Sequence, residues 1–187
     1  MAKIKAVFID RDGTINVEKE YVYKIEDFEL IPGTIDALKL LTNHGIRIYI
    51  ITNQAGIAKG YYTEKQFRQL TTSMLEMFEK EGIKVEKVLY CPHHPEGTVP
   101  KYTMNCLCRK PNTKLIEDVI MLKKYLINEL ALIGDKNSDI EAGNRVGIIT
   151  YLIQTGYGKK HQINTTATFV KSDILSAAQH ITGQINA

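Results

Sequence analysis

The 187-residue sequence predicts an α/β protein with a parallel sheet flanked by helices, organised as a single domain over residues 1–187. Buried strands alternate with amphipathic helices along the chain, which is the pattern of a parallel sheet with right-handed crossovers. Hydrophobic residues make up 44% of the chain and charged residues 24%, as is ordinary for a globular domain with a full core. We find no internal repeat, low-complexity tract or linker.

The predicted strands are apolar runs that end at polar residues or glycine: 6–9, 46–51, 83–90, 130–133 and 147–153. The predicted helices repeat apolar residues at helical spacing. They run from Pro32-Gly33 to about Gly45, from a capping box at Thr63 to Gly82, over 115–122, after Asp139, and from about Asp173. The polar and aromatic segment 16–30 is expected to form a loop or flap over the end of the first strand.

Composition excludes several classes of function. The net charge of +3 is too small to argue for nucleic acid as a partner. No apolar run is long enough to span a bilayer, and the first strand begins too early to leave room for a signal peptide. We therefore expect a cytoplasmic protein with no membrane partner.

Four short polar motifs are expected at the C-terminal rim of the sheet: Asp10/Asp12, Thr52/Asn53, Arg109/Lys110 and Asp135/Asp139. Neighbouring carboxylates stay ionised together only where a cation neutralises them, and hard oxygen ligands suit Mg²⁺. The motifs also supply donors for an anion. A cation site beside an anion site predicts phosphoryl transfer.

Chemical need suggests a role for each residue. Asp10 leaves the strand first and is the expected nucleophile, while Asp12 is the expected acid that protonates the leaving alkoxide and later activates water. Thr52 and Lys110 would bind the phosphoryl oxygens, and Mg²⁺ would be held by Asp10, Asp12 and Asp135. The alternative for any single acid is a loop aspartate that binds backbone donors.

These motifs resemble, in order, those of the haloacid dehalogenase-like (HAD) phosphatases. The matching stretches are Asp10-Arg11-Asp12-Gly13-Thr14, Thr52-Asn53, Arg109-Lys110-Pro111 and Gly134-Asp135-Lys136-Asn137-Ser138-Asp139. The resemblance implies a Rossmann-like HAD fold, an aspartyl-phosphate on the first aspartate and acid–base work by the second. The segments after Thr14 and Gly56 are too short for a separate cap domain, so we expect none.

All three cysteines fall in one segment, Cys91-Pro92-His93-His94 to Cys106-Leu107-Cys108. Their odd number argues against disulfides, and thiolates with imidazole are the usual ligands of tetrahedral Zn²⁺. Cys91, His93, Cys106 and Cys108 would form a closed, structural zinc site in a loop over about 91–108. His94 is an alternative to His93, and reduced thiols with solvent-facing histidines are the alternative to zinc.

This loop and the run Asn53-Gln54-Ala55-Gly56-Ile57-Ala58-Lys59-Gly60-Tyr61 are similar to the D-glycero-D-manno-heptose 1,7-bisphosphate 7-phosphatase family. That family removes the 7-phosphate during nucleotide-activated heptose synthesis for lipopolysaccharide or surface glycans. The resemblance implies a small phosphorylated sugar as partner and places substrate contacts at Arg11, Glu18, Lys19, Glu20, Tyr21, Asn53, Gln54, Ala55, Arg109 and Lys136. Arg109 suits the phosphate that is not cleaved, because guanidinium grips phosphate bidentately.

Three matters stay open at this level. A histidinol-phosphate phosphatase shares the aspartate motifs and a comparable zinc loop, and is the nearest alternative function. A zinc module for nucleic acid is the alternative outside enzymes, and the absence of tryptophan and of a basic stripe argues against it. The sequence does not indicate which anomer of the heptose bisphosphate is preferred, nor whether the pathway leads to lipopolysaccharide or to another glycan. A small domain without a cap is compatible with a monomer.

Overall fold

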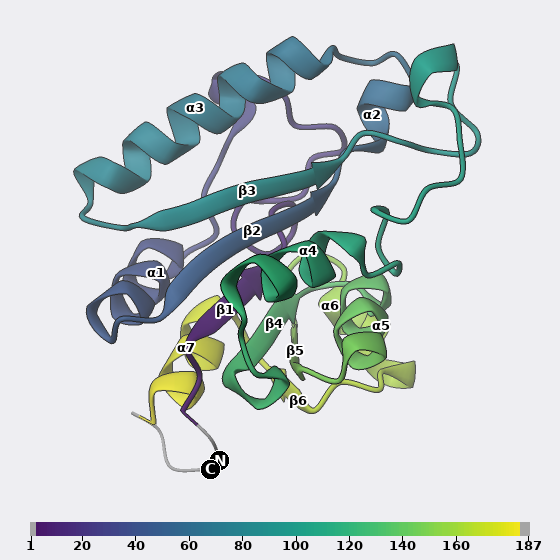
Figure 1. Ribbon diagram of the computed structural model, residues 1–187. Coiled ribbons are helices and arrows are strands. Elements are labelled where there is room, and N and C mark those ends of the chain that lie inside the picture. The colour runs from purple at the N-terminus through teal and green to yellow at the C-terminus, as the bar shows by residue number, and fades with distance from the viewer. Residues whose placement is uncertain (1–2, 184–187) are drawn as a thin grey trace.

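The computed structural model describes residues 3–183. It is built on a six-stranded parallel sheet in the order β3-β2-β1-β4-β5-β6 (Figure 1). The strands are β1 (Ala6–Ile9), β2 (Arg47–Asn53), β3 (Val85–Cys91), β4 (Leu130–Gly134), β5 (Ile149–Ile153) and β6 (Phe169–Lys171). The predicted α/β class with a parallel sheet is confirmed.

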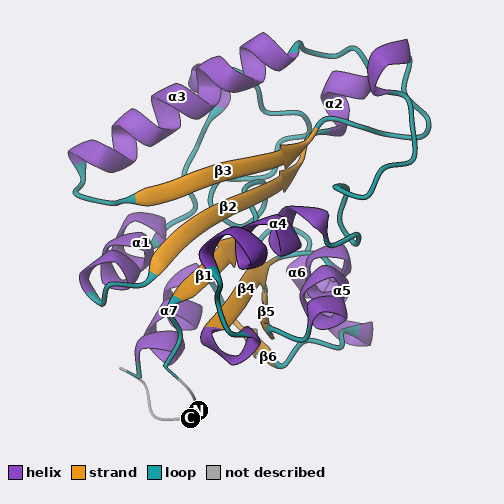
Figure 2. Cartoon of the chain, in the orientation of Figure 1, coloured by secondary structure: helices purple, strands orange, loops and turns teal. Residues whose placement is uncertain are grey.

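Helices cover both faces of the sheet (Figure 2). One layer consists of α1 (Thr34–Asn43), α3 (Glu64–Lys80) and α7 (Ile174–Thr182), and the other of α4 (Lys114–Lys123) and α5 (Asn137–Val146). The short helices α2 (Ala55–Ala58) and α6 (Gly158–His161) follow the ends of β2 and β5. Single 3₁₀ turns lie at Ile25–Asp27, Pro100–Tyr102, Ile127–Glu129 and Gln162–Asn164.

The central strand β1 is buried on both faces, because its successive side chains point to opposite helix layers. Ile9 belongs to the cluster that contains Leu38 of α1, whereas Phe8 belongs to the cluster that contains Ile116 of α4. All four of these side chains are at most 1% exposed. The two cores hold β1 rigidly, and β1 ends at the first pair of predicted aspartates.

Helix boundaries follow the capping signals in the sequence. Thr63 caps α3: its hydroxyl oxygen accepts a hydrogen bond from the Gln66 backbone N–H, and the Gln66 side-chain oxygen accepts one from the Thr63 backbone N–H. Asp173 caps α7 in the same way. The predicted strand 147–153 begins only at Ile149, since Gly147 ends α5 in the left-handed conformation with φ of 80°.

Strand β6 was not predicted. It pairs in parallel with β5, with Phe169 opposite Tyr151, and it covers the sheet edge next to β5. The strand has only three residues and none of them is fully buried, so its sequence lacks the apolar run that marks the other strands.

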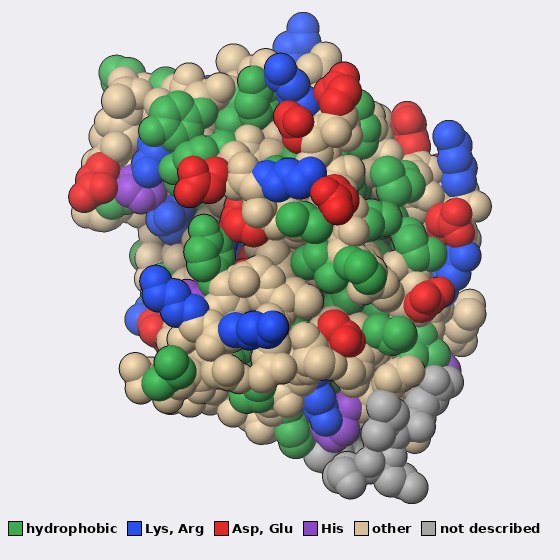
Figure 3. All heavy atoms as spheres, turned by 180° about the vertical axis from the view of Figure 1, so that it is seen from behind, with side chains coloured by type: hydrophobic (Ala, Val, Ile, Leu, Met, Phe, Trp, Pro, Cys, Tyr) green, Lys and Arg blue, Asp and Glu red, His purple; other side chains and the backbone are tan. Residues whose placement is uncertain are grey.

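No separate cap domain interrupts residues 3–183, as the sequence indicated. The prediction of one domain over 1–187 stays a prediction, and its two ends lie outside the described residues. Among the described helices, none combines the length and the apolar character needed to cross a membrane. Acidic and basic side chains are interspersed on the face shown in Figure 3.

Candidate active site

The C-terminal ends of β1, β2 and β4 open into a cavity of about 370 Å³. It lies beside the point where the strand order reverses about β1, the usual ligand site of an open α/β sheet. Most of the predicted site residues line it. The lining consists of Asp10, Asp12, Glu18, Glu20, Tyr21, Thr52, Asn53, Gln54, Ala55, Tyr62, Arg109, Lys110, Lys136, Ser138, Asp139 and Tyr157.

Three buried carboxylates meet beside this cavity, and two of them, Asp10 and Asp139, line it. Asp10 follows β1, Asp135 follows β4, and Asp139 lies in the first turn of α5; each offers an oxygen within 4.8 Å of the others. Burial, followed by the neighbouring carboxylates, raises the pKa of Asp135 to about 8. Burial also raises the pKa of Asp10 to about 6, against the opposing effect of Lys110. Crowded carboxylates of this kind favour a cation among them.

The local contacts of Asp135 fit a divalent cation. Its Oδ2 accepts a hydrogen bond from the backbone N–H of Tyr157 at 2.8 Å, whereas its Oδ1 is buried and has no hydrogen-bond partner among residues 3–183. An unpartnered carboxylate oxygen next to two further carboxylates is a hard-oxygen donor set of the type that Mg²⁺ prefers. The cluster could therefore hold Mg²⁺.

Two glycines make room for the Asp135 carboxylate. A Cβ on Gly13 or on Gly156 would lie 2.2 Å from Asp135 Oδ2, closer than any real contact. Both glycines also have positive φ, of 89° and 51°. The turn after β1 and the loop after β5 thus close around the same carboxylate.

Lys110 is buried and neutralises part of the carboxylate cluster. Its Nζ lies 2.7 Å from Asp10 Oδ1 and 2.6 Å from Asp139 Oδ1, and it donates to the carbonyl of Ile51 at 2.9 Å. Burial alone would lower the pKa of Lys110, but the charges of Asp10 and Asp139 outweigh burial and raise it. The ammonium therefore stays charged at the position where a phosphoryl group would meet Asp10.

Asp12 lines the same cavity but is not part of this cluster. Arg11 donates to it from Nε at 3.0 Å and from Nη2 at 2.7 Å, and Asn16 and Gln54 add further hydrogen bonds. Burial raises the pKa of Asp12, but the Arg11 charge and these hydrogen bonds outweigh it and lower the pKa. In this arrangement Asp139, rather than Asp12, completes the carboxylate group with Asp10 and Asp135.

Two residues predicted to contact substrate do not line the cavity. Arg11 is 1% exposed, because it turns inward to Asp12, to the carbonyl of Val22 and over the ring of Phe67. Lys19 pairs with Glu29 at the surface instead. In contrast, Lys136 reaches the cavity, where it lies 2.9 Å from Glu18.

Four cavity residues were not among the predicted site residues. Asp139 and Ser138 stand in the fourth motif, and the acid pair in that motif is the signal that points to Asp139. Tyr62 and Tyr157 carry no such signal, since an aromatic residue next to a glycine-containing turn is as typical of a core as of a site. Tyr157 packs its ring 4.7 Å from the Lys136 ammonium.

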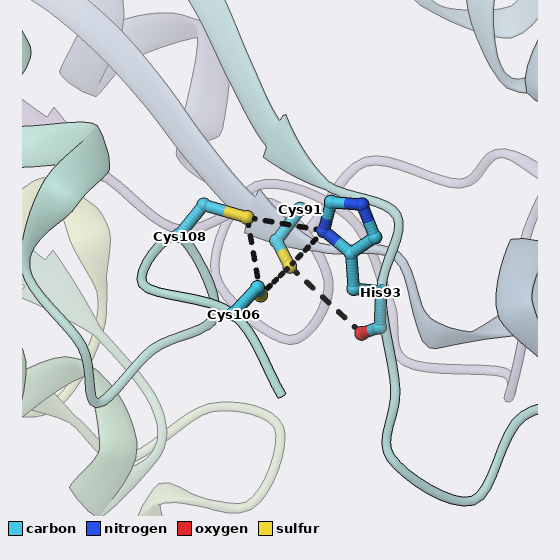
Figure 4. Close-up of side chains that lie close together, drawn as sticks. All are labelled: Cys91, His93, Cys106 and Cys108. Carbon is cyan, nitrogen blue, oxygen red and sulfur yellow. Dashed lines mark hydrogen bonds between the residues drawn. The ribbon is translucent and has the colours of Figure 1, made fainter. Parts of the chain in front are cut away.

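A second cluster gathers three thiols and one imidazole. Cys91 ends β3, and Cys106 and Cys108 return to it at the end of the long loop between β3 and α4. Figure 4 shows these side chains and that of His93 pointing toward one another. The Sγ of Cys106 lies 3.3 Å from the Sγ of both Cys91 and Cys108, and His93 Nδ1 lies 3.4 Å from Cys108 Sγ.

One tetrahedral zinc ion could bind these four atoms once the thiols move slightly apart, since two thiolates on such an ion lie roughly 3.8 Å from each other. The donor set is closed, as expected of a structural site, and could hold zinc. His94 is not part of the cluster, because its Nδ1 accepts a hydrogen bond from the Glu96 backbone N–H at 3.1 Å.

The cysteine cluster is tied directly to the cavity. Both ends of the Asn53 amide bind the backbone of Lys110, each at 3.0 Å. The backbone N–H of Gln54 donates to the carbonyl of Cys91 at 2.8 Å. An ordered loop therefore helps to fix the end of β2 and the position of Lys110, which contacts Asp10.

Comparisons with known proteins agree with this geometry. The HAD-hydrolase-like family model matches residues 107–177. The D-glycero-alpha-D-manno-heptose-1,7-bisphosphate 7-phosphatase of Photorhabdus laumondii is 48% identical over 158 residues, which are 83% of this chain and 85% of that protein. The D-glycero-beta-D-manno-heptose-1,7-bisphosphate 7-phosphatase of Escherichia coli is 36% identical over 189 residues, 98% of this chain and 97% of that protein.

The fold is also found among solved structures. A crystal structure of D,D-heptose 1,7-bisphosphate phosphatase from B. bronchiseptica, complexed with magnesium and phosphate, has a TM-score of 0.88 and 25% identity. It covers 97% of this chain and 100% of its own. Identity and coverage of this extent establish membership: the chain belongs to the heptose-1,7-bisphosphate 7-phosphatase family of HAD-like hydrolases.

Proposed function

We propose that the protein removes the 7-phosphate of D-glycero-D-manno-heptose 1,7-bisphosphate in a Mg²⁺-dependent reaction. The observation that carries this proposal is the buried group of Asp10, Asp135 and Asp139, in which Lys110 pairs with Asp10 and Asp139 beside the cavity. Family membership supports the choice of substrate. The reaction would belong to the synthesis of nucleotide-activated heptose.

Asp10 would act as the nucleophile. One of its oxygens attacks phosphorus at position 7, the bond between phosphorus and the sugar oxygen breaks, and an aspartyl-phosphate forms on Asp10. Asp12, which takes up a proton from solvent when the anionic substrate binds, gives that proton to the departing sugar oxygen, which leaves heptose 1-phosphate. The Asp12 carboxylate then takes a proton from water, water attacks the phosphorus, and inorganic phosphate and free Asp10 result.

The remaining charges would hold the phosphates. Thr52 and Lys110 would donate hydrogen bonds to the non-bridging oxygens of the phosphoryl group. Asp10, Asp135 and Asp139 would hold Mg²⁺. A bound Mg²⁺ supplies charge neutralisation for the dianionic phosphate. Arg109, at the side of the cavity next to the cysteine cluster, would grip the 1-phosphate.

Zinc would occupy the site of Cys91, His93, Cys106 and Cys108 and would have a structural role. It would order the loop from Cys91 to Cys108, and Arg109 and Lys110 follow directly after the last zinc ligand.

We further propose a monomer, which light scattering in solution tests directly.

A comparison of three substrates tests the proposal. The purified protein with Mg²⁺ is given the α and β anomers of the heptose bisphosphate and, separately, histidinol phosphate, and ³¹P NMR identifies the phosphate that is lost. We expect loss at position 7, with the α anomer preferred, because the relative named for that anomer shares 48% identity and those named for the β anomer share 36% to 41%. Hydrolysis of histidinol phosphate without action on either anomer would instead support the alternative function.

A further inference from the structure

The side-chain amide of Gln54 uses both of its ends. Its Nε2 donates to Thr52 Oγ1 at 2.7 Å and to Asp12 Oδ2 at 3.0 Å. Its Oε1 accepts from the hydroxyl of Tyr62 at 2.5 Å. Gln54 is only 2% exposed, so this amide connects two residues of the proposed reaction with a tyrosine that has no role in it so far.

The ring of Tyr62 is closely packed at the wall of the cavity. It is 5% exposed and stacks on Tyr23 with centroids 5.1 Å apart and ring planes 11° apart. A Cβ at Gly56 would lie 2.1 Å from Tyr62 Cε1, so only glycine allows α2 to approach the ring this closely. Burial raises the pKa of Tyr62, which keeps the hydroxyl protonated and able to donate.

When Asp12 is ionised, it determines the direction of every hydrogen bond among Tyr62, Gln54, Thr52 and Asp12. A carboxylate only accepts, so the amino end of the Gln54 amide must face Asp12 and its carbonyl end must face Tyr62. The second N–H of the same amide goes to Thr52 Oγ1, and the Thr52 hydroxyl then keeps its own proton for another acceptor. A reversed amide would bring its carbonyl oxygen against the Asp12 carboxylate.

We propose that Tyr62 and Gln54 are a positioning pair: the Tyr62 hydroxyl fixes the orientation of the Gln54 amide, which aims the Thr52 proton at the phosphoryl group and holds the Asp12 carboxylate beside it. The inference rests on the proposed phosphatase function and adds two residues that act through others. Neither residue forms or breaks a bond with substrate.

The test compares Tyr62→Phe with Tyr23→Phe in the full-length, metal-loaded protein. Both substitutions remove one hydroxyl from the same ring stack, but only Tyr62 donates to Gln54 in the described structure. Kinetics are measured with the heptose bisphosphate, whose alkoxide must be protonated on leaving, and with 4-nitrophenyl phosphate, whose phenolate leaves without a proton.

We expect Tyr62→Phe to lower kcat/KM, which reports the first phosphoryl transfer, about five- to tenfold with the heptose bisphosphate, the effect of one buried neutral hydrogen bond. The fall with 4-nitrophenyl phosphate should be smaller, because misplacement of Asp12 matters less for that substrate. Tyr23→Phe should leave both rates unchanged. An equal fall with the two substrates, no fall at all, or the same fall in Tyr23→Phe would overturn the proposal.

A double variant tests whether the two residues act as one unit. Gln54→Met removes the amide, so adding Tyr62→Phe should cause no further loss of kcat/KM, whereas multiplied losses would contradict the pairing. Should Tyr62→Phe not fold, Gln54→Met alone must show the same stronger loss with the heptose bisphosphate, and equal losses would refute the idea.

One readout is independent of turnover. The side-chain NH₂ signals of Gln54 in ¹H–¹⁵N spectra should shift in Tyr62→Phe and stay in place in Tyr23→Phe. Unmoved signals in Tyr62→Phe would refute the pair even if the protein is an active phosphatase. A wild-type protein inactive on every phosphate ester would instead refute the proposed function.

Discussion

The Nζ of Lys110 lies 2.7 Å from Asp10 Oδ1, although the two residues are 100 positions apart in the sequence. Lys110 reaches this position at the end of the cysteine-containing loop, where Asn53 clamps its backbone to the end of β2. The pair is almost fully buried, with side chains 2% and 7% exposed. The proposed nucleophile is therefore aligned by a residue whose own place depends on the loop.

Replacement of Lys110 by Met should reduce both activity and stability. It leaves Asp10 and Asp139 buried without their shared cation, which typically costs about 3–5 kcal/mol. The matched control is Lys114→Met, since Lys114 forms an exposed pair with Asp118 that solvent screens. Urea unfolding measures the two free energies, and similar values would contradict a shared buried ion pair at Lys110.

Loss of the proposed zinc should loosen the loop more than it changes the chemistry itself. Metal analysis of the purified protein should find one zinc per chain. Cys106→Ser removes one of the four ligand atoms that lie within 4.8 Å of one another, and we expect a lower thermal midpoint and a raised KM for the bisphosphate. Leu107→Ser, at an exposed neighbouring position, is the control. A protein that contains no zinc and is unaffected by Cys106→Ser would remove this part of the account.

Gly156→Ala should weaken Mg²⁺ binding. The new Cβ would lie 2.2 Å from Asp135 Oδ2 and 2.7 Å from Gly13 Cα, so the carboxylate must move. Gly45→Ala imposes a similar positive φ where no atom lies within 4 Å, and thus reports the backbone strain alone. We expect about a tenfold or greater rise in the Mg²⁺ concentration for half-maximal activity in Gly156→Ala only. Equal behaviour of the two variants would argue against contact with the metal site.

The contribution of His180 to stability should fall as the pH drops below about 6.5. Burial, followed by the charge of Lys171, lowers the pKa of His180, whose Nδ1 lies 3.0 Å from the Tyr151 hydroxyl. A group with a depressed pKa in the folded state contributes stability above its unfolded pKa and loses it as the pH falls through the folded value. In urea unfolding between pH 7.5 and 5.5, the wild type should therefore lose stability relative to His180→Gln as the pH falls. Parallel pH profiles of the two proteins would rule out His180 as the cause.

Much of the site could be predicted because of one geometric rule. The C-terminal ends of parallel strands share one rim, so Asp10, Thr52 and Asp135 are expected together once three strands are recognised. The structure brings Asp10 and Thr52 to the lining of one cavity, and it places Asp135 next to Asp10. The cysteine cluster was predictable for a different reason, namely that its four residues are rare and crowd into one segment.

Side-chain direction was the part that the sequence could not supply. Arg11 stands between two site aspartates, yet the turn after β1 sends it into the core toward Phe67. Tyr62 lies outside every motif and reaches the site only because α2 and α3 fold its ring behind Gln54. Strand β6 was missed because an edge strand of three partly exposed residues carries no burial pattern.

The most direct test of the central claim is phosphate release from D-glycero-D-manno-heptose 1,7-bisphosphate by the wild type and by Asp10→Asn, followed by ³¹P NMR. We predict Mg²⁺-dependent loss of the 7-phosphate by the wild type and a fall of about a thousandfold or more in Asp10→Asn, with thermal unfolding little changed. Turnover by folded Asp10→Asn at a rate near that of the wild type would contradict the account.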